Sequence, residues 1–325
     1  MALVFGFTGS TELSEISAAV SGAGGDVAFG NYALLVGVVL LVAGFGFKIS
    51  AAPFQMWCPT FTKELTPVVA FLSVASKAAG FAVLFRVLFT GFFDVSLDWA
   101  VLIAVLAAAS MSIGNAVAIG QSNIRRLFGY STIAHAGYLL VGVAAGVNTA
   151  GGLPDAPVFA SIGLNSVLFY LVAYTATNLT AFFAIAAIGE RVGSDRISDY
   201  AGLFARSPVL AMTLALALIA LIVGRHWKFH RPGAKLYVFT AAVDSGLAWL
   251  AIVGVVNSAV SAYYYIRIIR IMFLQQASVS PGAPPSRSPA PWAALAVAAA
   301  VLVFLGVAPG FVLEAAGAAV SALGV

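Results

Sequence analysis

The sequence predicts an all-α, multi-pass membrane protein. Of its 325 residues, 62% are hydrophobic and only 9% are charged, whereas about a quarter of the residues in a soluble domain carry charge. Apolar runs of about the 20 residues that cross a bilayer as a helix follow one another along the chain. These two observations favour a bundle of membrane-spanning helices.

Eight spans are expected, in chain order. An apolar segment at Ala2–Phe7 comes first and is too short to cross, so it resembles the end of a lost helix. Six of the spans are charge-free runs, and the other two, Thr66–Phe93 and Leu127–Val147, are interrupted only by Lys77, Arg86 and His135. In chain order the eight are Val27–Phe47, Thr66–Phe93, Trp99–Ile124, Leu127–Val147, Ala156–Gly189, Ser207–Gly224, Ser245–Ile266 and Ser288–Leu313.

Alternate connections between the spans separate by the sign of their charge. The positive-inside rule places the basic set on the cytoplasmic side. That set is Lys63, Arg125, Arg126, Arg191, Arg196, Arg206, Arg270 and Arg287. The opposite connections carry Glu12, Glu15, Asp26, Asp94, Asp98, Asp155 and Asp244. The separation requires Ser207–Thr240 to cross the membrane once. Because that segment is too long for one unbroken helix, a helix broken near its middle is predicted. Phe45–Phe54, with a lysine followed by a proline, predicts a second broken helix.

Three lysines are candidates for proton transfer. An ionisable group at the bilayer centre costs about 2.5–3.5 kcal/mol on insertion scales, so a chain that keeps one there usually uses it. Lys77 lies mid-span among small residues. Lys48 and Lys235 lie near the two expected breaks, and for these two, snorkelling to the interface is the alternative. Lysine suits the task because burial disfavours its charged form, whereas arginine stays charged.

Other polar residues in the spans allow two interpretations each. His135 is either a hydrogen-bonded core residue or a relay group, since histidine titrates near neutral pH. Arg86 is either a buried partner or a snorkelling side chain. Tyr263, Tyr264 and Tyr265 are interpreted as an interfacial aromatic belt.

Several function classes are excluded by the composition. The single cysteine, Cys58, rules out a disulfide framework, an iron–sulfur cluster or a cysteine-rich zinc site within the chain. No glycine-rich phosphate loop follows a strand pattern. The net charge of +4 comes largely from membrane-flanking loops and indicates topology, so no nucleic-acid partner is expected.

Four stretches resemble subunit N of the NADH–quinone oxidoreductases, the antiporter-like membrane subunits of respiratory complex I. They are FKISAAPFQMWCPTF, TPVVAFLSVASKAAGFAVLFRVL, SNIRRLFGYSTIAHAGYLLVG and VVNSAVSAYYYIRI. The resemblance implies two inverted five-helix repeats, each with one broken helix and buried lysines at mid-membrane height. Lys48 and Lys235 would be the broken-helix lysines, Lys77 would bridge the repeats, and His135 matches a family histidine. The family's buried glutamate lies on a helix upstream of the residues present.

The domain boundaries that follow leave the first repeat incomplete and the chain N-terminally truncated. Residues 1–30 are expected to hold a helix remnant and a loop, 31–93 the end of the first repeat, 98–272 the second repeat, and 291–325 a C-terminal transmembrane helix and tail.

The resemblance also implies a multi-pass subunit in a cell membrane, the inner or plasma membrane. There it would lie in the lipid bilayer beside other membrane subunits of the same complex, its sister antiporter-like subunits above all. No cofactor is expected in this chain, because NADH, flavin, iron–sulfur clusters and quinone would bind to partner subunits. Two alternatives stay open, a subunit of a cation/proton antiporter and a truncated structural remnant that conducts no protons.

Two stretches depart from the family pattern, Cys58–Leu65 and Arg225–Pro232. The second, RHWKFHRP, puts several basic residues at mid-membrane depth without an acidic partner. Its residues can be encoded as CGG CAT TGG AAA TTT CAT CGG, and a one-base shift gives Gly-Ile-Gly-Asn-Phe-Ile-Gly, which is close to the family pattern. A frame error in the gene sequence is therefore the hypothesis, and a genuine basic loop between two short helices is the alternative. Resequencing the gene separates them.

Overall fold

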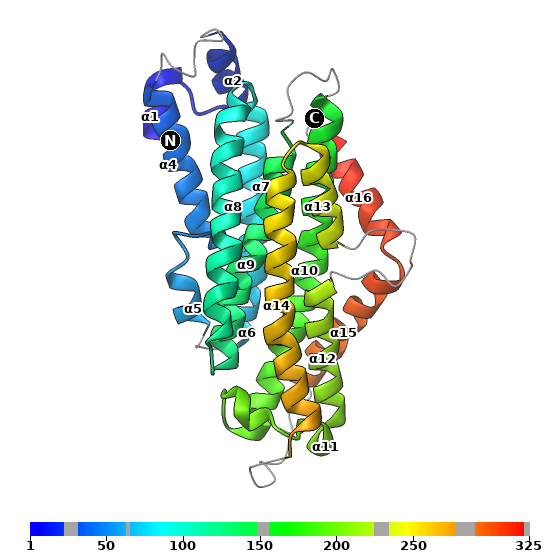
Figure 1. The fold of residues 1–325 in the computed structure, drawn as a ribbon. Coiled ribbons are helices and arrows are strands. Elements are labelled where there is room, and N and C mark those ends of the chain that lie inside the picture. The colour runs from blue at the N-terminus through cyan, green and yellow to red at the C-terminus, as the bar shows by residue number, and fades with distance from the viewer. Residues whose placement is uncertain (23–31, 63–65, 148–155, 224–233, 277–289, 322–325) are drawn as a thin grey trace.

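The chain folds into a bundle of long helices that run side by side (Figure 1). The computed structural model describes residues 1–22, 32–62, 66–147, 156–223, 234–276 and 290–321. Among these described residues, five helices are long and apolar enough to cross a membrane, and a sixth if one bent pair counts as a single span. Two further apolar segments, Leu34–Ile49 and Pro208–Ile222, are shorter than a full crossing. Eight spans were expected: five match these helices and one matches the bent pair, while the expected spans Val27–Phe47 and Ser207–Gly224 correspond to the two shorter segments, which border residues outside the described ranges.

The first part of the chain packs along one edge of the bundle. It comprises α1 (Ala2–Thr8), α2 (Leu13–Gly22), α4 (Tyr32–Ile49), α5 (Trp57–Phe61), α6 (Thr66–Phe71), η1 (Leu72–Ser76), α7 (Lys77–Phe85), η2 (Arg86–Gly91) and η3 (Phe93–Val95). Elements η1 and η2 are wider π-type turns within one continuous span, Val68–Gly91. Such turns leave backbone groups out of the regular ladder and occur often at functional sites.

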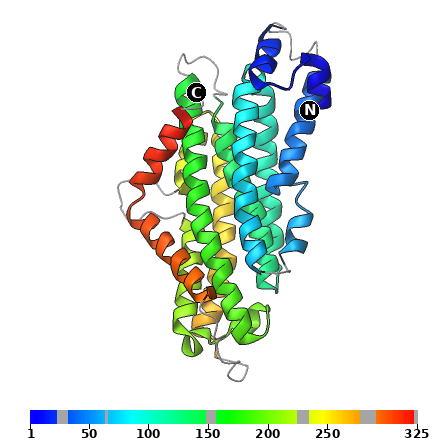
Figure 2. The same cartoon turned by 180° about the vertical axis from the view of Figure 1, so that it is seen from behind.

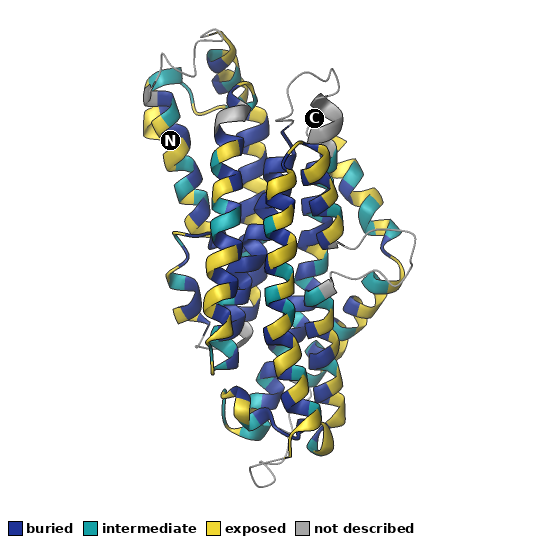
Figure 3. Ribbon diagram, in the orientation of Figure 1, coloured by how far each residue is buried: buried dark blue, intermediate teal, exposed yellow. Residues whose placement is uncertain are grey.

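The second part forms the rest of the bundle. It comprises α8 (Ser96–Ile119), α9 (Ile124–Ala145), α10 (Ala156–Val192), η4 (Ile197–Tyr200), α11 (Leu203–Arg206), α12 (Pro208–Val223), α13 (Ala234–Asp244), α14 (Ala248–Leu274), α15 (Ala290–Val307) and α16 (Gly310–Ser321). Helix α9 is the central element, because 94% of its most apolar window is buried and α8, α10, α13 and α5 all pack on it. Figure 3 shows its ribbon in dark blue, the colour of buried residues, behind α8 and α14.

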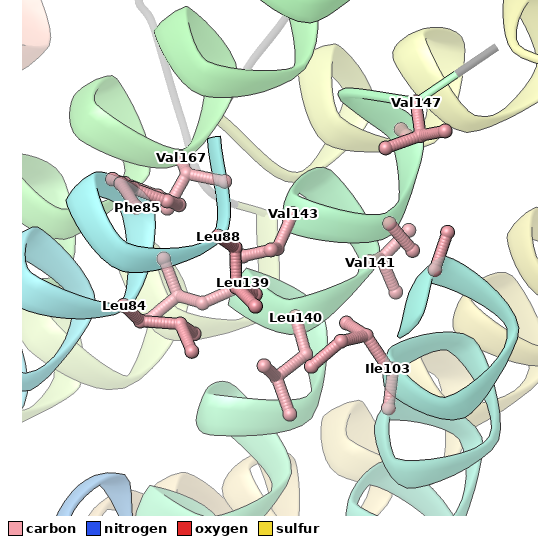
Figure 4. Close-up of a cluster of buried hydrophobic side chains, with 14 of the residues drawn as sticks. Leu84, Phe85, Leu88, Ile103, Leu139, Leu140, Val141, Val143, Val147 and Val167 are labelled. Atoms are coloured by element: carbon pink, nitrogen blue, oxygen red, sulfur yellow. The ribbon is translucent and has the colours of Figure 1, made fainter. Parts of the chain in front are cut away.

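The core around α9 is close-packed and apolar. Figure 4 shows Leu139 and Val143 of α9 beside Leu84 and Leu88 of the Val68–Gly91 span, while Leu140 lies toward Ile103 of α8. Glycine lets α9 approach α10, since a Cβ built on Gly163 would lie 2.5 Å from the Gly146 amide nitrogen. This close approach fixes how the two helices cross.

The first predicted helix break is present, and its polar backbone groups are satisfied by protein. Helix α4 ends at Ile49, and Ser50 adopts a left-handed φ of 62°. Beyond it, the Ala52 amide donates to Ser110 Oγ of α8 at 2.9 Å, and Trp57 Nε1 donates to the Phe47 carbonyl at 3.0 Å. Such partners are what a broken helix needs at membrane depth.

The second predicted break would lie between α12 and α13, which Figure 1 shows stacked end to end beside α14. Residues 224–233, and with them the disputed stretch Arg225–Pro232, lie outside the described residues. So do Lys63, Glu64 and Leu65 of the other disputed stretch, whereas Cys58 is buried in α5.

The last segment differs from the single helix that was expected. Trp292–Val307 and Gly310–Ser321 meet at a bend of 83°. Figure 2 shows the pair, in orange and red, lying obliquely over α10. Pro309 lies at the bend, and proline cannot donate the backbone hydrogen bond that would continue the helix.

The charged ends of the bundle agree with the predicted segregation. The connection that leads into α9 meets the connection that follows α10. The Ile124 amide donates to the Asp195 carbonyl at 2.9 Å, and Arg125 Nε lies 2.9 Å from Asp195 Oδ1. At the other end, Ser21 of α2 donates to Asp94. The arginines of the η4–α11 connection and the carboxylates near α2 therefore lie at opposite ends (Figure 1).

Candidate functional site

Lys77 is buried where the π-type segment η1 gives way to α7. Its side chain is 2% exposed, and its Nζ donates to the Thr132 carbonyl of α9. The same nitrogen lies 5.8 Å from the centre of the Tyr174 ring. A helix carbonyl that already accepts its own ladder bond has a second lone pair for this amine.

Thr132 starts a polar stripe that runs along α9. The Tyr174 hydroxyl donates to Thr132 Oγ1 at 3.2 Å. One turn further, His135 is 2% exposed, and its Nδ1 lies 2.6 Å from the Tyr170 hydroxyl. Its Nε2 lies 3.4 Å from the Tyr265 hydroxyl. Both ring nitrogens of His135 therefore face phenol groups.

Lys235 lies at the other end of this stripe. It is 3% exposed, and its Nζ lies 4.6 Å from the centre of the Tyr138 ring, one turn beyond His135 on α9. Its hydrogen bond to the Ile222 carbonyl of α12 is long, at 3.5 Å. The quadrupole of an aromatic ring attracts a cation placed over its face, so Tyr138 offers Lys235 the kind of support that a carboxylate would otherwise give.

Thr132, His135 and Tyr138 recur every three residues and share one face of α9. Six residues of helix rise by about 9 Å, so one continuous stripe connects the surroundings of the two buried amines. We call these three residues the α9 stripe.

A small cavity borders the stripe between the two ends. It has a volume of about 30 Å³, and its lining includes His135, Tyr170, Tyr174, Thr177 and Lys235. One water needs roughly 10–15 Å³ measured in this way. The cavity therefore has room for about two waters, with hydroxyl groups, an imidazole and an amine to bind them.

No carboxylate pairs with either buried lysine within the part of the chain that the structure describes; the salt bridge there joins Arg125 to Asp195. The two amines contact backbone carbonyls and aromatic rings instead: Lys77 contacts Thr132 and Tyr174, and Lys235 contacts Ile222 and Tyr138.

Lys48 differs from the expected buried position. It is exposed at the end of α4, although its stem packs inward, since a Cβ built on Gly80 would lie 3.4 Å from Lys48 Cγ. Three of the four predicted site residues are therefore buried at or beside the α9 stripe, namely Lys77, His135 and Lys235. The fourth, Lys48, lies at the surface, next to the helix that carries Lys77. Arg86 is also exposed.

The interpretation of three tyrosines as an aromatic belt is wrong for two of them. Tyr263 is 60% exposed, but Tyr264 and Tyr265 are 1% and 0% exposed. The Tyr265 hydroxyl reaches Ser131 and His135. Successive residues of a helix point about 100° apart, so three in a row cannot all face lipid.

A second buried polar cluster was missed by the sequence reasoning. Asn115 of α8 is fully buried; its Nδ2 donates to the Tyr138 hydroxyl at 3.3 Å and to Asn257 Oδ1 at 3.1 Å. The Tyr264 hydroxyl donates to Asn115 Oδ1 at 3.0 Å. This cluster holds the ring that lies beneath Lys235. The signal that could have found it is an uncharged amide in each of two apolar spans, α8 and α14.

Comparison with known proteins agrees with the resemblance seen in the sequence. The family model for the transmembrane part of NADH:quinone oxidoreductases and Mrp antiporters matches residues 1–261. The NADH-quinone oxidoreductase subunit N of Dehalococcoides mccartyi is 42% identical over 85% of this chain and 56% of its own length. That of Desulforamulus reducens is 38% identical over 97% of this chain and 62% of its own length. The chain thus spans a little over half the length of these curated relatives.

Two solved structures share the fold. A chain of respiratory complex I from Thermus thermophilus is 29% identical, with a TM-score of 0.71, and the match covers 96% of this chain and 63% of that one. A chain of the Mrp complex from Dietzia sp. is 22% identical, with a TM-score of 0.81 over 99% of this chain and 64% of that one. The expected all-α, antiporter-like membrane fold is confirmed.

Proposed function

Because this chain belongs to the NADH:quinone oxidoreductase/Mrp antiporter transmembrane family, in its subunit N branch, we propose that it relays protons within a membrane-bound quinone oxidoreductase. The relay would use Lys77, His135 and Lys235, and Lys48 would continue it at the surface of α4. Hydride and electron transfer, with NADH, flavin, iron–sulfur clusters and quinone, would belong to partner subunits. The neighbours of this chain would be the sister antiporter-like subunits.

One observation carries the proposal, namely that a single helical stripe and a water-sized cavity connect two buried amines. Lys77 bonds to the first residue of the α9 stripe and Lys235 lies over the ring of the last, with His135 between them. Proton transfer along hydrogen bonds needs donors and acceptors in contact or joined by one water. The stripe and the cavity supply both over about 9 Å.

The length of the α9 stripe also supports an alternation of charge. Two unit charges as far apart as the ends of the stripe, about 9 Å, repel each other by about 2 kcal/mol in a medium of effective dielectric 20. A proton on Lys77 therefore disfavours one on Lys235, and the reverse. Positive charge that a partner subunit brings near one amine would drive the proton toward the other.

The test is the ratio of protons moved to electrons transferred, in vesicles that contain the whole complex. Lys77→Met keeps the length of the side chain and removes the amine, so the complex should assemble while the ratio falls. Arg86→Met is the matched control, because Arg86 is an exposed cation on the same span. An unchanged ratio in Lys77→Met, with full assembly, would refute the relay.

A second candidate is a subunit of a cation/proton antiporter, since the family includes Mrp antiporters and the Dietzia Mrp chain shares the fold. The two differ in what drives them. Exchange of Na⁺ or K⁺ for protons in vesicles without an electron donor would favour the antiporter. Proton movement that requires donor and quinone would favour the oxidoreductase. The absence of both activities would indicate a remnant that conducts nothing.

A further inference from the structure

An apolar groove lies on the outer side of α10, away from the α9 stripe. It has a volume of about 520 Å³, and α15 forms its other wall. Its floor includes Ala176 and Ala298, both buried, while Val172 and Val297 on the walls are 40% and 65% exposed. We call it the α10–α15 groove. Figure 2 shows α15 crossing α10 obliquely on this face.

The groove has the length of one bilayer leaflet. Along α10 its lining runs from Val172 to Phe183, which is about 17 Å of helix. Half of a hydrocarbon core is about 15 Å thick. Its Phe183 end points toward the arginine-rich end of the bundle, the cytoplasmic end by the positive-inside rule.

Two opposite charges lie beyond the Phe183 end. Glu190 is 18 residues, or five full turns, from Val172, so it lies on the same face of α10 as the groove. Arg191 stacks on Trp292 at the start of α15, with its guanidinium carbon 5.3 Å from the ring centre, and donates to Ser207 Oγ. Its Nε is buried and has no hydrogen-bond partner, and Glu190 is exposed without an ion pair among the described residues.

We propose that the α10–α15 groove holds an acyl chain of a phosphatidylethanolamine from the cytoplasmic leaflet. The guanidinium of Arg191 would bind the phosphate, and the carboxylate of Glu190 would bind the ammonium group. One positive and one negative side chain at the mouth match a zwitterionic headgroup that carries a free amine. An anionic headgroup would bring its charge next to Glu190 without compensation.

The experiment uses the full chain in vesicles that contain phosphatidylethanolamine or phosphatidylglycerol with a photoactivatable diazirine on one acyl chain. Crosslinked peptides are identified by mass spectrometry. Phosphatidylethanolamine should label the α10 and α15 walls of the groove about 1.4- to fivefold more than phosphatidylglycerol, the range that exposed charge pairs supply. Glu190→Gln should remove this preference, and Arg191→Gln should lower labelling by both lipids.

Val297→Trp places an indole in the groove at an exposed position and should abolish labelling of its walls. Ala296→Trp is the control, because it introduces the same indole at an exposed site of α15 that does not line the groove. Labelling spread evenly over all outward-facing helices, or unaffected by Val297→Trp, would overturn the acyl-chain site. Equal labelling by the two lipids in the unaltered chain would overturn the headgroup assignment. Neither outcome touches the proton relay.

Discussion

Replacing Asn115 by leucine should destabilise the fold through the groups it leaves behind. Leucine keeps the branched shape of asparagine, with methyl groups in place of the amide oxygen and nitrogen, so the loss of polar partners adds to any cost of fitting the larger side chain. The Tyr264 hydroxyl loses the acceptor that it reaches at 3.0 Å, and Asn257 Oδ1 loses a donor at 3.1 Å. Each buried polar group left without a partner costs about 1–3 kcal/mol. We expect Asn115→Leu to lower the free energy of unfolding by about 3 kcal/mol.

A double-mutant cycle isolates the part due to the orphaned hydroxyl. Tyr264→Phe removes that hydroxyl, so Asn115→Leu should cost about 1–3 kcal/mol less in the Tyr264→Phe background than in the unaltered chain. The assay is unfolding of the purified chain in mixed micelles by increasing detergent, followed by tryptophan fluorescence. Asn178→Leu with Tyr264→Phe is the control pair, because Asn178 bonds to Ser73 at 2.8 Å and not to the tyrosine cluster. Additive costs within about 0.5 kcal/mol for the test pair would refute the reasoning.

Three further predictions concern the relay, the packing and the basic end of the bundle. Tyr138→Leu should lower the proton-to-electron ratio more than Tyr138→Phe, because phenylalanine keeps a ring 4.6 Å from Lys235 Nζ; equal loss would mean that the hydroxyl matters and the ring does not. Gly163→Leu should reduce the yield of folded protein in size-exclusion chromatography, since its Cβ would lie 2.5 Å from the Gly146 amide nitrogen; an unchanged yield would show that the crossing of α9 and α10 adjusts. The pKa of Asp199 should lie below the ordinary aspartate value in a carboxyl NMR titration, because Ser194 and Ser198 donate hydrogen bonds to its carboxylate. Any stability that Asp199 contributes is therefore present above its unfolded pKa and is lost as the pH falls through the lower folded pKa.

The sequence predicted where helices lie better than which way they face. In a soluble helix the polar face marks the outside, whereas in a membrane both lipid and protein interior are apolar. Val141 and Val101 illustrate this, because both lie in apolar spans, yet one is 0% and the other 59% exposed. The exposure of Lys48 and the burial of Tyr265 could not be read from hydropathy for the same reason.

Depth along a span is encoded more directly than orientation. Lys77 lies in the middle of its apolar run, so its amine has no short path to either membrane interface. The position of Lys77 within the run was therefore enough to predict that the side chain is buried. Lys48 lies at the end of α4, where its position within the run left snorkelling open. The bend of 83° before Gly310 was also missed, since Pro309 was counted within an apolar run and its missing amide was not considered.

The α9 stripe shows how far spacing alone could have gone. His135 was predicted as a relay candidate from its side chain, and a threonine and a tyrosine stand three residues to either side of it, on the same helical face. What spacing could not supply is the partner on each neighbouring helix. Lys77 and Lys235 lie 58 residues before and 100 residues after His135 in the sequence, and only the packing of α7 and α13 against α9 places both at the stripe. A relay built from separate helices is thus a property of how they pack, so variants that tilt α13 without touching Lys235 should impair proton transfer as much as those that remove the amine.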